Sequence, residues 1–238
     1  MEQPYYSVVV PVYNEEESLP ILVTSIAKVM AGLGRSWELL LIDDGSRDRS
    51  YAIMLELKQE HPQIRCIKFR ANAGQTAAMA AGFDQARGEV VITIDADLQN
   101  DPADIPRLVE KLNEYDAAVG WRHKRQDSRW RLLQSRIANA IRNRLSGETI
   151  TDTGCSLKAY KRPAIEKLKL YKGLHRFLPT LIKMEGYTVT EVKVSHHPRE
   201  HGVSKYGMWN RAIPAFFDLL AVRWMKKRHL NYEIEEER

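Results

Sequence analysis

Apolar residues follow two alternating patterns along the first hundred positions of the chain. Runs rich in valine, isoleucine and leucine predict buried β-strands at residues 6–12, 37–42, 64–69 and 89–94. Between them, apolar residues spaced three or four positions apart predict helices at residues 16–33, 50–60 and 75–86. Strands and helices that alternate with short connections indicate an α/β fold with a mostly parallel central sheet flanked by helices.

The strand predicted at residues 89–94 ends abruptly in Asp95, Asp97 and Gln99. Ligands of open α/β sheets bind at the carboxyl ends of strands, and alternate residues of an extended chain point to one side. Carboxylate and amide oxygens suit Mg²⁺ or Mn²⁺ better than zinc, so we expect Asp97 and Gln99 to hold such an ion. The alternative is helix capping near Pro102, which accounts for Asp101 but not for the other acids.

Composition and charge narrow the class of protein. The chain has 238 residues, of which 44% are hydrophobic and 28% charged, as in a soluble globular protein. Its net charge of +5 favours anionic partners. It starts Met-Glu-Gln-Pro, without the basic segment of a signal peptide, and no uncharged apolar run reaches the roughly 18 residues of a membrane span. Cys66 and Cys155 lack metal-type spacing, so a reducing cytoplasm is expected.

Two glycine-rich ways of binding phosphate are missing from the sequence. No Gly-x-Gly-x-x-Gly follows the first strand, and there is no Gly-Lys-Ser/Thr loop. A bound nucleotide would therefore have its phosphates neutralised by the metal expected near Asp97. At the ends of neighbouring strands, Glu15 and Asp44 are placed to accept hydrogen bonds from a base or ribose. Capping of a turn is the alternative, and for Asp43 it is about as good an explanation.

Several stretches resemble a known family in both order and spacing. VVVPVYNE, LLIDDGS, the NAGQ turn and TIDADLQNDP are similar to those of the family-2 glycosyltransferases, which are inverting enzymes with an A-type nucleotide-sugar fold. VGWR, TDTGCSLKAYKR, HRFLP and HPREHGVSKYG resemble the subgroup that glycosylates polyprenyl phosphates, which includes dolichol-phosphate mannose synthase and the undecaprenyl-phosphate glycosyltransferases. The resemblance covers residues 5–228. It implies transfer of a mannose- or glucose-type hexose from a GDP- or UDP-sugar to a polyprenyl phosphate at the cytoplasmic membrane face.

The same resemblance implies roles for individual residues. Around the nucleotide sugar it places Pro11, Tyr13, Glu15, Asp44, Ala73, Gln75, Asp95 and Asp97, and on the metal Asp97 and Gln99. Around the acceptor phosphate it places Arg122, Arg131, Ser135, Arg199, Ser204 and Lys205. The reaction itself is expected to depend on Asp97, Arg122, Arg131 and Asp152. Asp152 would lie under the sugar, with an Asx turn as the competing interpretation.

The basic residues of the second half invite two other interpretations. Eight Lys or Arg side chains stand against one acid, Asp127, in residues 122–144, which is typical of nucleic-acid binding. Only Trp121 and Trp130 accompany them as aromatic platforms for bases. The acids at the strand ends would also repel nucleic acid, so we expect no nucleic-acid partner. Three histidines within residues 196–201 suggest zinc, but Pro198 and Gly202 break any helix that would align them.

The expected chemistry follows from the charges. A phosphate monoester already carries about 1.5 to 2 negative charges at neutral pH, so it needs no strong general base to attack. Two anions must instead approach each other, and a metal on the donor with arginines on the acceptor would screen their repulsion. The alternative acceptor, a soluble or polymer hydroxyl, would need a base, for which Asp152 is the one obvious candidate.

Residues 209–230 place apolar and aromatic side chains at helical spacing beside Arg and Lys. This pattern predicts an amphipathic helix at a membrane interface, and a helix docked on the domain's own core is a nearly equal alternative. We expect a catalytic domain at residues 1–207, followed by a membrane-interfacial helical segment and acidic tail at residues 208–238. The membrane contact would be peripheral, and a membrane-protein partner and a homo-oligomer are left open.

Overall fold

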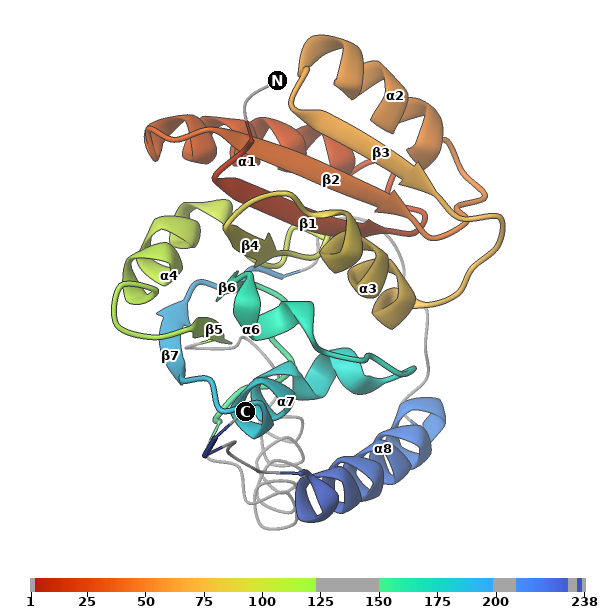
Figure 1. Cartoon of the computed structure of the whole chain (residues 1–238). Coiled ribbons are helices and arrows are strands. Elements are labelled where there is room, and N and C mark those ends of the chain that lie inside the picture. Colours follow the sequence, from red (N-terminus) through yellow and green to blue (C-terminus); the bar gives the residue numbers. More distant parts are fainter. Residues whose placement is uncertain (1–2, 123–149, 199–208, 231–234, 237–238) are drawn as a thin grey trace.

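A single sheet of seven strands, in the order β3-β2-β1-β4-β6-β5-β7, forms the centre of the computed structural model (Figure 1). The structure describes residues 3–122, 150–198, 209–230 and 235–236, with the backbone alone at residues 209–213. The strands are β1 (Tyr6–Val12), β2 (Trp37–Asp43), β3 (Ile64–Lys68), β4 (Val90–Thr93), β5 (Ala117–Arg122), β6 (Lys158–Lys161) and β7 (Val189–Val194). All run parallel except β6, so the predicted mostly parallel sheet is confirmed.

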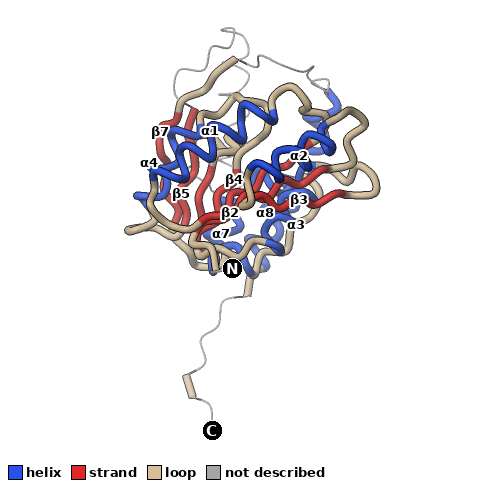
Figure 2. Tube along the Cα trace, turned by 90° about the horizontal axis from the view of Figure 1, so that it is seen from above, coloured by secondary structure: helices blue, strands red, loops and turns tan. Residues whose placement is uncertain are grey.

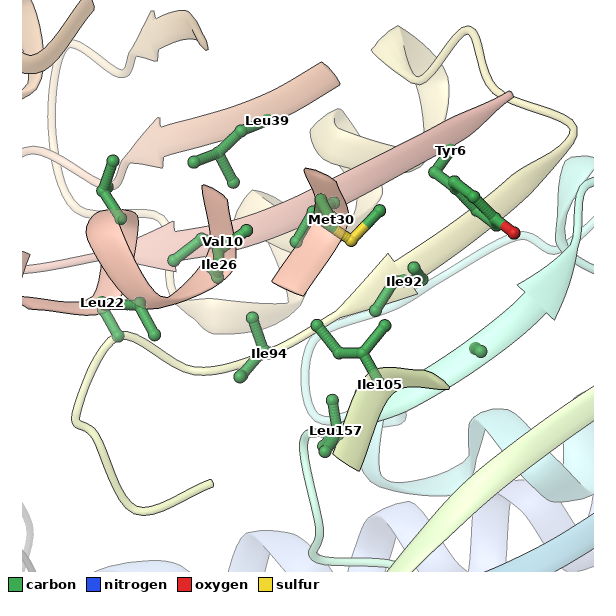
Figure 3. Close-up of a cluster of buried hydrophobic side chains, with 14 of the residues drawn as sticks. Tyr6, Val10, Leu22, Ile26, Met30, Leu39, Ile92, Ile94, Ile105 and Leu157 are labelled. Carbon is green, nitrogen blue, oxygen red and sulfur yellow. The ribbon is translucent and has the colours of Figure 1, made fainter. Parts of the chain in front are cut away.

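Helices cover both faces of this sheet (Figure 2). One face carries α1 (Leu19–Gly32), α2 (Ser50–Glu60), and the 3₁₀ turn η1 (Pro102–Asp104) with α4 (Ile105–Lys111). The other carries α3 (Gln75–Gln85), α6 (Pro163–Glu166) and α7 (Leu178–Met184). In Figure 3, Leu22, Ile26 and Met30 of α1 lie over Val10 and Leu39 of the sheet, which is the stripe that the sequence predicts.

Helix α1 begins at Leu19, three residues after the predicted start. The chain before it is diverted by Asn14, which adopts a left-handed conformation with φ of 51°, and by Glu15, whose side-chain oxygen accepts a hydrogen bond from the Ser18 hydroxyl at 2.9 Å. Residues that precede the helix are thus used to shape a turn after β1. The other predicted boundaries agree with the structure to within one or two residues.

The direction of β6 decides which segments meet. Since β6 is antiparallel to both β4 and β5, it begins at the edge where the parallel strands end. Lys158, its first residue, pairs with Thr93 of β4 and with Val119 of β5. The segment before β6 therefore lies between the turn that follows β4 and the end of β5 at Arg122. This is the carboxyl edge at which open α/β sheets bind ligands.

Helix α8 (Trp209–Arg228) has one docked side. Leu219 and Val222 are buried against Leu174 and Phe177 of the 3₁₀ turn η2 (Leu174–Phe177) and against Leu181 of α7. In Figure 1 this helix lies at the opposite end of the view from α2. Docking on the domain's own core, one of the two interpretations of this segment, is thus confirmed for one side.

The outward side of α8 is apolar as well. Phe217 and Trp224 are each 64% exposed, and Phe216 and Leu220 are exposed beside them. Lys227 and Arg228 are exposed on the same helix. None of the helices in the described ranges combines the length and the hydropathy that crossing a bilayer requires.

Candidate active site

The turn after β4 presents three oxygen-bearing side chains. Asp95, Asp97 and Gln99 are all partly exposed. The Gln99 backbone N–H donates to Asp97 Oδ1 at 3.2 Å, and Leu98 between them has a φ of 59°. A bulky residue in the left-handed region is strained, and such strain is concentrated at functional sites. The turn that carries Asp97 and Gln99 at the sheet edge is therefore held in a specific conformation.

A buried network beneath this turn was not predicted from the sequence. The Ser156 hydroxyl donates to Asn100 Oδ1 at 2.8 Å and accepts from the Asp95 backbone N–H at 3.2 Å. Thr93 Oγ1 donates to the Ser156 carbonyl oxygen at 2.7 Å. These bonds fasten the turn after β4 to the segment before β6. Asn100 and Ser156 lie 56 positions apart, so no local pattern connects them.

Asp95 is the most perturbed carboxyl of the site. Burial and the neighbouring charge of Asp97 raise its pKa to about 6, although the charge of Lys158 and the hydrogen bond from Gln75 oppose the shift. Gln75, the first residue of α3, donates from Nε2 to Asp95 Oδ1 at 2.7 Å. Asp95 and Asp97 thus form a pair of carboxylates whose mutual repulsion a bound cation would relieve.

Asp44, at the end of β2, shapes the turn that leads into α3. Its oxygens accept hydrogen bonds from the backbone N–H groups of Ala73 at 2.7 Å and Gly74 at 2.9 Å, and from Asn72 Nδ2 at 2.9 Å. Burial raises the pKa of this carboxyl, and the two backbone donors oppose that shift. Asp44 therefore positions Ala73 and Gln75, two other residues expected around the nucleotide sugar.

Hydrogen bonds to side chains connect the segments that follow β1 and β2. The Glu15 backbone N–H donates to Ser50 Oγ at 2.8 Å, and the Arg47 backbone N–H donates to Asn14 Oδ1 at 2.8 Å. Pro11 and Tyr13 lie at the same edge and are partly exposed. Asp43 Oδ1 accepts from the Ser46 backbone N–H at 3.1 Å, which is the turn capping that the sequence offers as one of two interpretations of this residue.

An ion pair closes the other half of the site. Arg122 Nε donates to Asp152 Oδ2 at 2.7 Å, and Nη2 donates to Oδ1 at 2.8 Å. Burial lowers the pKa of the guanidinium, but Asp152 outweighs it and raises that pKa overall. Gly154 leaves room for this arrangement, because a Cβ there would lie 2.8 Å from Arg122 Nη2. Asp152 thus holds Arg122 in place with both of its oxygens.

Lys158 lies beneath both halves. It is 2% exposed, and burial lowers the pKa of its ammonium group while the charges of Asp95 and Asp152 oppose that shift. Burial therefore disfavours the charged form of Lys158, and the charges of Asp95 and Asp152, one from each half, favour it. In the sequence, Lys158 belongs to the stretch TDTGCSLKAYKR that resembles the family, but no role is expected for it there.

Five of the expected acceptor residues lie outside the described residues: Arg131, Ser135, Arg199, Ser204 and Lys205. The start of the histidine-containing segment is described, and there the His197 backbone N–H donates to the Gln99 carbonyl oxygen at 2.9 Å. Within the described ranges, no three His, Cys, Asp or Glu side chains are grouped as a metal site of that composition would need.

Sequence comparisons relate the chain to known proteins. The family model described as Glycosyl transferase family 2 matches residues 7–169. A dodecaprenyl-phosphate galacturonate synthase from Rhizobium johnstonii is 42% identical over 227 residues, which are 93% of this chain and 67% of the relative. An undecaprenyl-phosphate 4-deoxy-4-formamido-L-arabinose transferase from Salmonella paratyphi B is 44% identical over 216 residues, 90% of this chain and 66% of the relative. The chain thus spans about two thirds of the length of these relatives.

Solved structures share the fold. Glucosyl-3-phosphoglycerate synthase from Mycobacterium tuberculosis, in complex with Mn²⁺, UDP-glucose and phosphoglyceric acid, superposes with a TM-score of 0.68 at 17% identity, covering 96% of this chain and 81% of that one. A mannosyltransferase from Pyrobaculum calidifontis in complex with GDP-Man and Mn²⁺ gives 0.65 at 18% identity, covering 98% and 66%. The predicted A-type glycosyltransferase fold is confirmed. The chain belongs to glycosyl transferase family 2, within the polyprenyl-phosphate group that its motifs resemble.

Proposed function

We propose that this protein transfers a sugar from a nucleotide diphosphate to a polyprenyl phosphate. One observation carries the proposal: the acidic turn after β4 and the Arg122–Asp152 ion pair lie at the same sheet edge, joined through Ser156. An acid-rich half suits a metal-bound diphosphate, and an arginine-bearing half suits an anionic acceptor. The names of the two polyprenyl-phosphate relatives support a lipid phosphate as the acceptor.

For the donor half, we propose that Asp97 and Gln99 hold Mg²⁺ or Mn²⁺. Their hard oxygen atoms fit such an ion, as does the repulsion that raises the pKa of Asp95. When bound, the ion would neutralise charge on the leaving diphosphate. Pro11, Tyr13, Glu15, Asp44, Ala73, Gln75 and Asp95 are the residues that we assign to the nucleotide and its sugar. The choice between GDP and UDP, and the identity of the hexose, stay predictions.

For the acceptor half, Arg122 is the described cation that we assign to the lipid phosphate, and the sequence adds Arg131, Ser135, Arg199, Ser204 and Lys205. An oxygen of the lipid phosphate attacks the anomeric carbon while the nucleotide diphosphate leaves from the opposite face, which inverts that carbon. The acceptor is already ionised, so no base has to remove a proton. Catalysis is then a matter of position and charge, without a covalent enzyme intermediate.

A hydroxyl acceptor is the weaker alternative. A hydroxyl must lose its proton as it attacks, so a base has to reach it. Asp152, the acid that the sequence offers for this task, has both oxygens engaged by Arg122. The ion pair also stabilises the charged carboxylate, which makes it a poorer base. The geometry therefore favours an acceptor that arrives already charged.

The direct test is transfer of radiolabelled sugar from a panel of UDP- and GDP-sugars into organic-extractable lipid, with polyprenyl phosphate and Mg²⁺ or Mn²⁺. The panel should include uronic acid and amino-sugar donors as well as mannose and glucose. We expect label in lipid that EDTA abolishes. Asp97→Ala should lower the rate about 100-fold or more, because it removes electrostatic stabilisation of the leaving group.

Asp101→Asn is the matched control for that variant. Asp101 belongs to the same turn but caps the following helix, accepting from the Ala103 backbone N–H at 2.9 Å, and an asparagine oxygen can take over that bond. Near-normal transfer by Asp97→Ala would contradict the metal assignment. Label that enters only water-soluble product would move the acceptor to the hydroxyl class.

A second prediction concerns Asp44. Asparagine at this position has one acceptor oxygen where the carboxylate serves three N–H donors, so Asp44→Asn should loosen the turn at residues 72–74. We expect nucleotide affinity, measured by titration calorimetry with UDP and GDP, to fall at least about tenfold, since bonds to a charged group are among the strong ones. Unchanged affinity with an unchanged melting temperature would remove Asp44 from the donor site.

We further propose that the outward side of α8 rests on the cytoplasmic face of the membrane. Phe216, Phe217, Leu220 and Trp224 form an exposed apolar stripe, and Lys227 and Arg228 lie on the same helix. Apolar side chains flanked by cations are typical of helices that lie in the headgroup layer of anionic lipids. The proposed lipid substrate requires such proximity. Residues 208–238 would then serve as a peripheral membrane segment of the catalytic domain at residues 1–207.

Vesicle binding tests this assignment. Phe217→Glu should weaken binding of the chain to phosphatidylglycerol vesicles at least about tenfold, because it removes an exposed aromatic ring that would enter the headgroup layer and adds a charge that anionic lipid repels. Ile21→Glu is the matched control, since Ile21 is 52% exposed on α1, a different helix. Equal losses for the two variants, or no loss for Phe217→Glu in sedimentation assays, would refute the membrane role of α8.

A further inference from the structure

Glu191, in the middle of β7, binds the turn that carries Asp152. Its Oε1 accepts hydrogen bonds from the backbone N–H of Thr151 at 2.8 Å and of Asp152 at 3.3 Å. Its Oε2 accepts from the Thr151 hydroxyl at 2.9 Å. One side chain thereby holds two successive residues of the segment that enters the site.

This contact reaches the guanidinium of Arg122 through a short series of bonds. Thr151 and Asp152 belong to no helix or strand, so no regular ladder fixes the direction of the Asp152 carboxylate. Two backbone N–H groups hold the carboxylate directly: that of Gly154 donates to Asp152 Oδ1 at 3.1 Å, and that of Arg122 in β5 donates to Oδ2 at 3.3 Å. Glu191 acts one step further back, by fixing the backbone of Thr151 and Asp152 from which this carboxylate extends. Asp152 in turn determines where Arg122 points.

The groups that Glu191 binds indicate how it acts. They are two backbone N–H groups and a hydroxyl, all uncharged. A glutamine can reproduce this pattern, because its amide oxygen accepts both backbone bonds and its amide nitrogen donates to the Thr151 hydroxyl instead. The geometry of the hydrogen bonds, and not the negative charge, is therefore what the turn requires.

We propose that Glu191 is a positioning residue for the acceptor phosphate: it orients the turn at residues 151–154 so that Asp152 aims Arg122 at the incoming phosphate. The inference rests on the proposed function, in which Arg122 contacts the acceptor. Glu191 would not touch either substrate. It belongs to none of the stretches that resemble the family.

The kinetic test compares Glu191→Ala with Glu191→Gln in the lipid transfer assay. Glu191→Ala should raise KM for the polyprenyl phosphate about tenfold and leave KM for the nucleotide sugar near its wild-type value, because only the acceptor half is disturbed. Glu191→Gln should restore KM for the lipid to near the wild-type value. Glu166→Ala, which removes an exposed glutamate of α6, is the control for loss of a surface charge.

A second measurement does not depend on the acceptor. The Nε–H of Arg122, held by Asp152 at 2.7 Å, should give an arginine side-chain NMR signal that exchanges slowly with water and vanishes in Arg122→Lys. Exchange should quicken at least tenfold in Glu191→Ala and stay slow in Glu191→Gln.

The outcomes separate the two proposals. An inactive wild-type chain with the expected NMR pattern would overturn the proposed function and keep the positioning of Arg122. If the wild-type chain is active, three results would refute the role of Glu191. They are an unchanged KM for the lipid in Glu191→Ala, an equal rise of both KM values in Glu191→Ala, and a Glu191→Gln variant as impaired as Glu191→Ala.

Discussion

The antiparallel pairing of β6 between β4 and β5 is the constraint on which the site depends. If β6 ran parallel to its neighbours, the segment that precedes it would lie at the far edge of the sheet. Because it runs the other way, Ser156 reaches the turn after β4, and Asp152 reaches Arg122 at the end of β5. The proposed donor half, built from parallel βα units, and the proposed acceptor half, built from the second part of the chain, thereby share one edge.

Charged side chains of opposite sign occupy different parts of that edge. Asp95 and Asp97 place negative charge on the proposed donor side, where burial and the charge of Asp97 together raise the pKa of Asp95. Arg122 and Asp152 compensate each other on the acceptor side, and Lys158 lies buried below both. An enzyme that joins two anions must place opposite charge near each of them. Here the acids that would bind a metal lie on the turn after β4, and the cation proposed for the acceptor, Arg122, lies at the end of β5, where Asp152 holds it.

The sequence predicts local structure and motif chemistry well, and long-range partners poorly. Periodicity locates β1 at its observed limits and α2 likewise, since both depend on neighbours within a few positions. The acids after β4 are recognisable because they interrupt an apolar run. By contrast, Arg122 and Asp152 lie 30 positions apart and Thr151 and Glu191 lie 40 apart. Their pairing follows from the direction of β6 and the placement of β7, which no local pattern encodes.

The most direct test of the account is the position of the metal in crystals grown with Mn²⁺ and UDP or GDP, located by anomalous X-ray scattering. We predict a single manganese peak ligated by Asp97 and Gln99, with the nucleotide diphosphate completing its coordination on the side of the edge that faces Arg122. A peak at other side chains, or nucleotide density away from the carboxyl ends of β1, β2 and β4, would contradict the division of this edge into donor and acceptor halves.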